Sequence, residues 1–151
     1  MKALVVFDSV AGNTRKIAEA IASGIAGGTK AVSVGSAEAK DLGRVSLLIV
    51  GSPTYGGRPT EAMQNFMASV ESSARDLSVA AFDTRLRMKL VKLFGFAADK
   101  IADRFKQIGS SVEEKPAGFI VTGRTGPLAE GELERASAWG QELSKKHAQR
   151  R

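Results

Sequence analysis

The 151-residue sequence contains no cysteine, which excludes disulfides, thiolate chemistry and cysteine-ligated iron–sulfur clusters on this chain. It has a single histidine, His147, close to the basic stretch that ends the sequence. We therefore expect neither a histidine-based metal site nor a histidine-containing catalytic triad. No apolar run is long enough to cross a bilayer, so no transmembrane segment is expected. A cysteine-free chain is compatible with a reducing compartment, and we expect a cytoplasmic protein.

Aromatic residues are also scarce, at 6% of the chain, with one tryptophan and one tyrosine. Lysine and arginine number 22 against 16 aspartates and glutamates, which gives a net charge of +6. A basic balance can indicate nucleic acid, a membrane surface or an acidic partner. Aromatics are not interleaved with the basic residues and no helix-turn-helix pattern is present, so nucleic-acid binding is not expected. A solvated basic surface is the simplest interpretation.

Five short apolar runs alternate with segments of helical periodicity. The runs, which we interpret as strands, cover residues 3–7, 31–34, 45–50, 77–82 and 117–121. The helical stripes cover residues 17–25, 63–70, 97–108 and 133–143, with a brief helix or turn over 36–42. Near-continuous apolar strands are typical of a parallel sheet covered by helices on both faces. The pattern predicts one doubly wound α/β domain over residues 1–147, followed by a short basic tail at 148–151.

Individual residues mark the ends and the packing of these helices. Thr60 is a candidate N-cap and Gly109 closes the helix before it. A group of acidic residues begins the last helix, where the helix dipole favours negative charge: Glu130, Glu132 and Glu134. Trp139 is expected to pack in the core.

In an open sheet of this type, ligands bind beyond the carboxyl ends of the strands. The segments expected there are rich in hydroxyls, glycine or arginine: residues 8–14, 51–59, 83–87 and 122–127. We expect the functional site to be built from these four segments.

The first of these segments suits a phosphate monoester. Ser9 and Thr14 offer hydroxyls, and Gly12 allows the backbone to approach an anion. The amides of residues 10–14 would converge at a helix N-terminus, whose partial positive charge favours anions. The alternative is an ordinary N-capped turn. The segment lacks the G-K-[ST] of a Walker A loop and is not G-x-G-x-x-G.

The segment after the third strand has a different character. Its sequence "PTYGG", residues 53–57, combines a rigid proline, an aromatic side chain and two glycines that expose backbone. These features suit a flat heterocycle whose polar edge is recognised by backbone groups, although a purely structural turn is the alternative.

Together, "SVAGNT" (9–14) and "GSPTYGG" (51–57) resemble the two cofactor loops of the flavodoxin-like FMN-binding family. The first is similar to the family's phosphate loop, [S/T]-x-T-G-N-T, and the second to the loop beside the isoalloxazine ring. The resemblance covers the whole chain and is to short-chain members, without an insertion in the fifth strand. It implies a sheet of strand order 2-1-3-4-5 and non-covalent binding of FMN.

The resemblance also implies roles for individual residues. The phosphate would lie on Ser9, Val10, Ala11, Gly12, Asn13 and Thr14. The ring would lie beside Pro53, Thr54, Tyr55, Gly56 and Gly57. The second ring-side loop would begin with Asp83, Thr84 and Arg85.

The sequence departs from the family pattern in three respects. Ala11 stands where the family has threonine, which removes one hydroxyl contact to the phosphate. No tyrosine or tryptophan occurs in residues 83–93 to cover the outer face of the ring, and Phe94 and Phe96 lie further along. The chain is basic, whereas flavodoxins are usually acidic.

A basic stretch at residues 85–92 also admits several interpretations. It contains Arg85, Arg87, Lys89 and Lys92. It can be a loop that enters the fourth helix, a cover or docking patch beside the flavin, or a short membrane-surface strip. Three of these cations, Arg85, Arg87 and Lys89, are expected to border the ring together with Arg58 and to raise its reduction potential.

The resemblance implies electron transfer between redox proteins, and the positive net charge predicts a partner that has an acidic docking face. Two alternatives remain open. One is a small FMN-dependent reductase that oxidises NAD(P)H or reduces a quinone or porphyrinogen. The other is a degenerate domain without flavin that has a regulatory or interaction role. An electron carrier is favoured over an enzyme because the flavin itself carries the redox chemistry.

Overall fold

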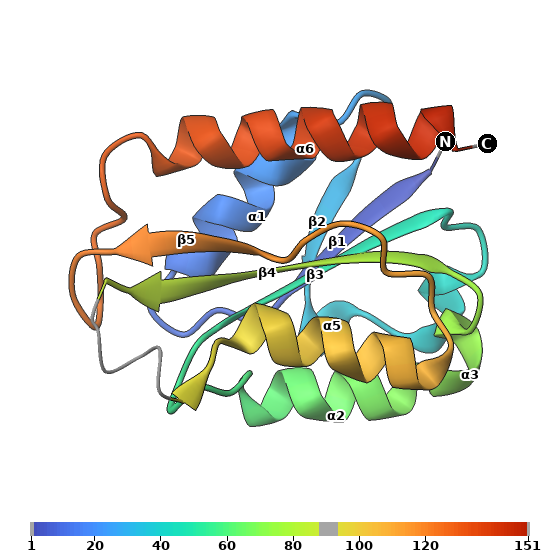
Figure 1. The fold of residues 1–151 in the computed structure, drawn as a ribbon, viewed down its shortest axis with the longest axis horizontal. Coiled ribbons are helices and arrows are strands. Elements are labelled where there is room, and N and C mark those ends of the chain that lie inside the picture. Colours follow the sequence, from blue (N-terminus) through green and yellow to red (C-terminus); the bar gives the residue numbers. More distant parts are fainter. Residues whose placement is uncertain (1, 88–93, 151) are drawn as a thin grey trace.

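The computed structural model describes residues 2–87 and 94–150, and its centre is a five-stranded parallel sheet. The strand order is β2-β1-β3-β4-β5, which confirms the predicted fold and order (Figure 1). The strands are β1 (Ala3–Phe7), β2 (Lys30–Ser33), β3 (Leu47–Pro53), β4 (Ser78–Leu86) and β5 (Ala117–Val121).

Helices cover both faces of the sheet (Figure 1). On one face lie α1 (Asn13–Ser23) and α6 (Glu132–Gln149), and on the other lie α2 (Glu61–Ser69), α3 (Glu71–Ala74) and α5 (Ala97–Ile108). Two 3₁₀ turns, η1 (Val34–Ser36) and η2 (Ala39–Leu42), take the place of the brief helix expected over 36–42. The tail expected at 148–151 begins later, because α6 continues through Gln149.

Alternate residues of the central strands face the two helical layers. Val6 and Leu48 belong to the core beneath α2 and α5, whereas Val5 and Ile49 belong to the core beneath α1 and α6. All four are fully buried. Burial on both faces explains why these strands are near-continuous apolar runs.

Two strands extend further than the sequence indicated. β3 was expected to end at residue 50 and continues to Pro53, while β4 was expected to end at residue 82 and continues to Leu86. Asp83, Thr84 and Arg85 therefore lie within a strand, and the prediction that they begin a loop was wrong. Asp83 pairs in register with Ser52 on β3 and with Gly118 on β5. Polar residues suggested a loop here because their buried partners come from distant parts of the chain.

The helix-end predictions agree with the structure. The Thr60 hydroxyl accepts a hydrogen bond from the Met63 amide at 3.2 Å, as an N-cap does. Gly109 ends α5 with a φ of 106°, in the left-handed region that favours glycine.

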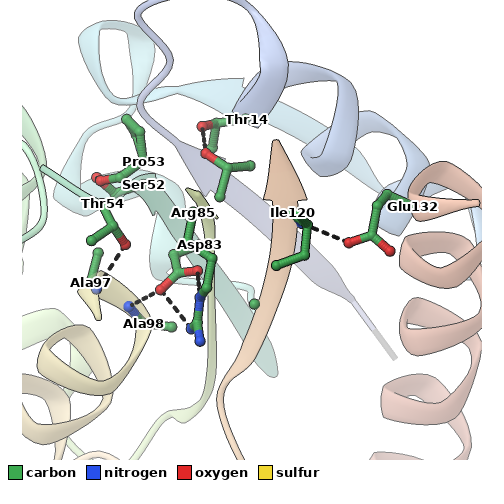
Figure 2. A network of polar contacts seen from close by, with 12 residues as sticks. Thr14, Ser52, Pro53, Thr54, Asp83, Arg85, Ala97, Ala98, Ile120 and Glu132 are labelled. Atoms are coloured by element: carbon green, nitrogen blue, oxygen red, sulfur yellow. Dashed lines mark hydrogen bonds and ion pairs between the residues drawn. The ribbon is translucent and has the colours of Figure 1, made fainter. Parts of the chain in front are cut away.

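The outer strand β5 is held by α6 and by the segment before it. The Glu132 carboxylate accepts a hydrogen bond from the Ile120 amide at 2.6 Å (Figure 2). The Ala129 amide donates to the Ile120 carbonyl at 2.9 Å, and Arg135 donates to the Gly118 carbonyl. The first turn of α6 is thereby fixed to β5.

Trp139, which was expected in the core, is partly buried and packs against the core beneath α1 and α6. Its ring packs edge-to-face against Phe82 at 6.3 Å and Phe119 at 6.2 Å between centroids. This arrangement is favourable for aromatic side chains beyond the area that they bury.

Candidate functional site

A cavity of about 330 Å³ lies beyond the carboxyl ends of the central strands. All four of the predicted segments contribute to its walls, together with Phe94 and with Val121 at the end of β5. The predicted residues that line it are Val10, Ala11, Asn13, Thr14, Pro53, Thr54, Tyr55, Gly56, Gly57, Thr84 and Arg85. A cavity of this size falls in the range of small-molecule sites.

Ser9 shapes the first loop from outside this lining. Its hydroxyl oxygen accepts hydrogen bonds from the amides of Gly12, at 3.1 Å, and Arg15, at 3.2 Å. Gly12 is the N-cap of α1 and has a φ of 95°. A Cβ at Gly12 would meet no atom within 4 Å, so the backbone conformation is what favours glycine here. Ser9 and Gly12 thus hold the loop in the form that presents Ala11, Asn13 and Thr14 to the cavity.

The "PTYGG" segment ends in a tight hairpin. The Tyr55 amide donates to the Arg58 carbonyl at 2.9 Å, and the Arg58 amide donates to the Tyr55 carbonyl at 3.0 Å. The two residues between them, Gly56 and Gly57, have φ values of 57° and 78°, as a two-residue hairpin turn of the I′ type requires. A Cβ on Gly57 would lie 2.2 Å from the Phe94 carbonyl oxygen, so this glycine also permits close packing of the hairpin on Phe94.

A chain of threonines joins the segments that surround the cavity (Figure 2). The Thr14 and Thr84 hydroxyls are hydrogen-bonded at 2.8 Å, and both residues are buried. The Thr54 amide donates to the Thr84 carbonyl at 2.9 Å, while the Thr54 hydroxyl accepts from the Ala97 amide at 3.0 Å. Thr84 therefore links the start of α1 to the hairpin segment, and Thr54 links that segment to the start of α5.

Asp83 lies behind the cavity wall and has no exposed surface. Its carboxylate accepts two hydrogen bonds from the Arg85 guanidinium, at 2.7 and 2.9 Å, and one from the Ala98 amide at 2.9 Å (Figure 2). The guanidinium also lies over the Phe96 ring, 3.5 Å from its centroid. Burial raises the pKa of Asp83, and the contacts with Arg85 and the Ala98 amide act against that rise.

This ion pair corrects one electrostatic expectation. Arg85 was expected to place a free positive charge beside the ring, but a carboxylate matches that charge in the structure. Arg58 lines a different hollow, described below, and Lys89 and Lys92 lie outside the described residues. The cation that lines the cavity without a recorded ion pair in residues 2–87 and 94–150 is Arg124.

Four lining residues were not among the predicted site residues: Leu86, Phe94, Val121 and Arg124. Arg124 lies in the 122–127 segment that was expected to contribute to the site, although no residue of that segment was singled out, and Phe94 had been noted only as an aromatic residue further along the chain. Leu86 is the last residue of β4 and Val121 is the last residue of β5. Leu86 was not predicted because β4 is longer than the sequence indicated.

No helix within residues 2–87 and 94–150 has the length and apolar character needed to span a membrane. The same residues contain no group of three or more His, Cys, Asp or Glu side chains placed to hold a metal ion.

Known structures with the same fold cover almost all of this chain. A flavodoxin from the domain Archaea is 24% identical, with a TM-score of 0.83 over 98% of this chain and 99% of that one. A flavodoxin, WrbA-like protein from Agrobacterium tumefaciens is 21% identical, with a TM-score of 0.78 over 99% of both chains. The flavodiiron core of Flv1 from Synechocystis is 19% identical, with a TM-score of 0.80, but all of this chain matches only 37% of that one. At these identities the likeness shows the fold alone.

Comparison with curated protein sequences gave no match. The sequence does match a family model, described as flavodoxin, over residues 5–139. That span includes the strands that end at the cavity and both loops that form its two ends. The chain belongs to the flavodoxin family.

Proposed function

We propose that this protein binds FMN non-covalently in the cavity and transfers electrons between redox proteins. Membership of the flavodoxin family implies a flavin cofactor, usually FMN. The proposal rests on one observation. Two different segments line the same cavity: a glycine-containing loop at the N-terminus of α1 and an aromatic hairpin. The first suits a phosphate and the second a flat ring.

The residues present fit the two ends of FMN. Ala11, Asn13 and Thr14 would hold the phosphate, on a loop kept in shape by Ser9 and Gly12. If the Thr84 hydroxyl donates to Thr14, the Thr14 hydroxyl is left to donate to a phosphate oxygen.

At the ring end, Tyr55 and Phe94 both line the cavity and are 48% and 63% exposed. Large aromatic side chains so exposed offer an apolar surface that a flat ring can cover. Bound flavin would supply the redox chemistry, and the chain's own residues would bind it, orient it and shield it from water.

The lining meets what an electron carrier requires. Among the described residues that line the cavity there are hydroxyls, an amide, apolar groups and guanidinium groups, but no carboxylate or imidazole. A carrier needs no side chain that moves a proton, whereas general acid–base catalysis does. The net charge of +6 supports a redox partner with an acidic docking face.

A cytoplasmic location stays a prediction, which cell fractionation would test.

The absorbance spectrum of the purified protein is the first test. We expect flavin bands, and we expect added NADPH to leave them unchanged while dithionite removes them. Bleaching by NADPH alone would replace the carrier with a reductase. Apoprotein that binds neither FMN nor riboflavin would instead identify a degenerate domain and overturn the proposal.

Substitution of Ala11 tests the phosphate end of the cavity. Ala11→Thr adds the hydroxyl that the family pattern has at this position, and a hydrogen bond to a charged group is worth about 1.5–3 kcal/mol. We therefore expect FMN to bind about tenfold or more tightly, with no change for riboflavin, in a fluorescence titration. Ala11→Val adds the same bulk without the hydroxyl and should give no gain. Equal effects on both flavins would contradict the phosphate assignment.

A further inference from the structure

A second hollow, of about 460 Å³, lies between the hairpin, α2 and α5. It is lined by Arg58, Pro59, Gln64, Met67, Lys100 and Arg104, and we call it the cationic groove. Figure 1 shows α2 and α5 side by side on the same face of the sheet. Three of the six lining residues carry a positive charge, and none is acidic.

The charges of the groove are only partly matched by the protein itself. Arg104 forms an ion pair with Glu71. Lys100 directs its ammonium group to a neutral carbonyl, and neither Lys100 nor Arg58 takes part in an ion pair within the part of the chain that the structure describes. The groove thus presents positive charge that an external carboxylate can meet.

The cationic groove and the cofactor cavity share their walls. Arg58 closes the hairpin whose glycines line the cavity. The Lys100 ammonium donates to the Phe94 carbonyl at 3.0 Å, and Phe94 lines the cavity. A molecule seated in the groove would therefore contact the segments that enclose the cavity.

Exposed apolar side chains gather beside the groove, at the cavity. Val10, Tyr55 and Phe94 all line the cavity and are 69%, 48% and 63% exposed. An apolar centre bordered by charged groups is the usual composition of a protein–protein interface.

We propose that the cationic groove, together with the exposed side chains of Val10, Tyr55 and Phe94, is the docking surface for an electron-transfer protein whose redox centre is surrounded by carboxylates. This proposal rests on the proposed function. Carboxylates in the groove would fix the orientation of the partner, while the apolar residues would bring the partner close to the cofactor. A small anion fits less well, because the cations are spread along the groove and two of them already donate to protein oxygens.

The test uses FMN-loaded protein and hexaglutamate as the probe. We expect chemical-shift changes in a ¹⁵N-resolved NMR titration to concentrate at residues 55–64 and 94–104. The double variant Arg58→Gln/Lys100→Gln should bind the probe about three- to tenfold more weakly, since exposed charge pairs contribute roughly 0.2–1 kcal/mol each. Added salt should weaken binding by the wild type more than binding by this variant.

The control variant is Lys30→Gln/Lys145→Gln, which removes the same charge from exposed positions on β2 and α6. We expect it to bind hexaglutamate as the wild type does. An equal loss of affinity in both double variants would show attraction by net charge alone and would overturn the proposal. Inorganic phosphate that shifts the groove resonances at lower concentration than hexaglutamate would also overturn it, in favour of a small-anion site.

Flavin binding is measured separately by absorbance, so the two proposals can fail independently. Protein that binds FMN, but shows no localised response to hexaglutamate, would retain the proposed function and lose the docking surface. Protein that binds no flavin, but responds to hexaglutamate at residues 94–104, would lose the electron-transfer partner and with it this inference.

Discussion

The Asp83–Arg85 pair places two charges where water does not reach the carboxylate. Asp83 is fully buried and the Arg85 side chain is 18% exposed. The cost of burying the carboxylate is offset by two hydrogen bonds from Arg85 and one from the Ala98 amide. The loss of either partner of such a pair leaves a charge without compensation.

Replacement of Arg85 should therefore destabilise the protein strongly. We expect Arg85→Met to lower the free energy of unfolding by about 3–5 kcal/mol at neutral pH, measured by urea denaturation. Burial already raises the pKa of Asp83, and removal of Arg85 would raise it further. A carboxyl whose folded pKa is raised loses stability as pH rises through the interval above its unfolded value. The deficit should therefore be smaller in mild acid than at neutral pH.

A double variant distinguishes the destabilisation caused by an uncompensated buried charge from that caused by lost contacts. Asp83→Leu/Arg85→Met removes both charges, and we expect it to recover much of the stability that Arg85→Met loses. A double variant less stable than the single one would show that the pair contributes net stability beyond mutual compensation.

Most residues of the cavity wall could be predicted from the sequence, because they belong to short local motifs. The glycines of the hairpin and the hydroxyls before α1 occur in compact segments, so their residue types, together with the resemblance to the flavodoxin loops, predicted their positions. The role of Thr84 was harder to predict, because its partners Thr14 and Thr54 are 70 and 30 residues away in the chain. Arg85 was misjudged for a different reason: its partner Asp83 is only two residues away, but residues at this spacing share a face only in a strand, and the segment was interpreted as a loop.

At the scale of elements, α1 and α6 pack closely through two glycines. A Cβ on Gly140 would lie 2.3 Å from the Ile21 carbonyl oxygen, and one on Gly24 would lie 2.1 Å from the Ser137 carbonyl oxygen. Real Cβ atoms do not approach a backbone atom so closely, so each helix requires a glycine where it meets the other.

Gly140→Ala tests this contact. Alanine is the better helix former by about 1 kcal/mol, but a forced separation of the backbones costs about 1–3 kcal/mol. We expect a net loss of stability in thermal unfolding, with α1 shifted and FMN bound more weakly, because the loop proposed to hold the phosphate leads directly into α1. Gln141→Ala, at an exposed position of the same helix, should have little effect. A stabilised Gly140→Ala variant would mean that the helices can separate at no cost.

Glu132, in the first turn of α6, is a second carboxylate that is held by hydrogen bonds. Hydrogen bonds from Arg135 and from the Ile120 amide hold the pKa of Glu132 below its usual value. The sequence placed Glu132 in an acidic cluster favoured by the helix dipole, and both Glu132 and Glu134 do lie in the first turn. Its bond to β5 was not foreseen, because the pairing joins two elements that no short motif contains.

We expect Glu132→Gln to lower the stability by about 1.5–3 kcal/mol at about pH 7. A group whose folded pKa is lowered contributes stability above its unfolded pKa and loses it as pH falls through the folded value. The difference between wild type and variant should therefore shrink in urea denaturation as pH falls below the usual range of a glutamate carboxyl. Glu134→Gln removes the same charge from an exposed site of the same turn and should change little. A difference that does not depend on pH would contradict the charged hydrogen bond.

At the scale of the whole molecule, the net charge of +6 should influence the bound flavin. Reduction adds negative charge at the ring, and surrounding positive charge favours that change. One unit charge about 10 Å away in near-bulk dielectric contributes ~0.4 kcal/mol, or roughly 20 mV for one electron. Several such charges would raise the potential by tens of millivolts relative to an acidic flavodoxin.

The prediction is a reduction potential that falls as ionic strength rises. Arg124→Gln should lower the potential by roughly 20 mV at low salt, because Arg124 lines the cavity. Arg44→Gln removes the same charge just before the amino end of β3, whereas the cavity lies at the carboxyl ends of the strands, and should have a much smaller effect. Redox titration of the wild type and both variants at two salt concentrations measures these differences in potential. Potentials that are indifferent to salt would show that the basic residues do not act on the flavin.

The contacts that fix β5 have a consequence for solubility. β5 is an outer strand of the sheet, and such a strand can recruit a strand from another molecule when its backbone groups are free. Here the outward amide and carbonyl of Ile120 are taken by Glu132 and Ala129, and the Gly118 carbonyl is taken by Arg135. The start of α6 therefore hinders edge-to-edge aggregation at β5. Without these contacts, the free backbone groups of the strand would be open to pairing with another chain.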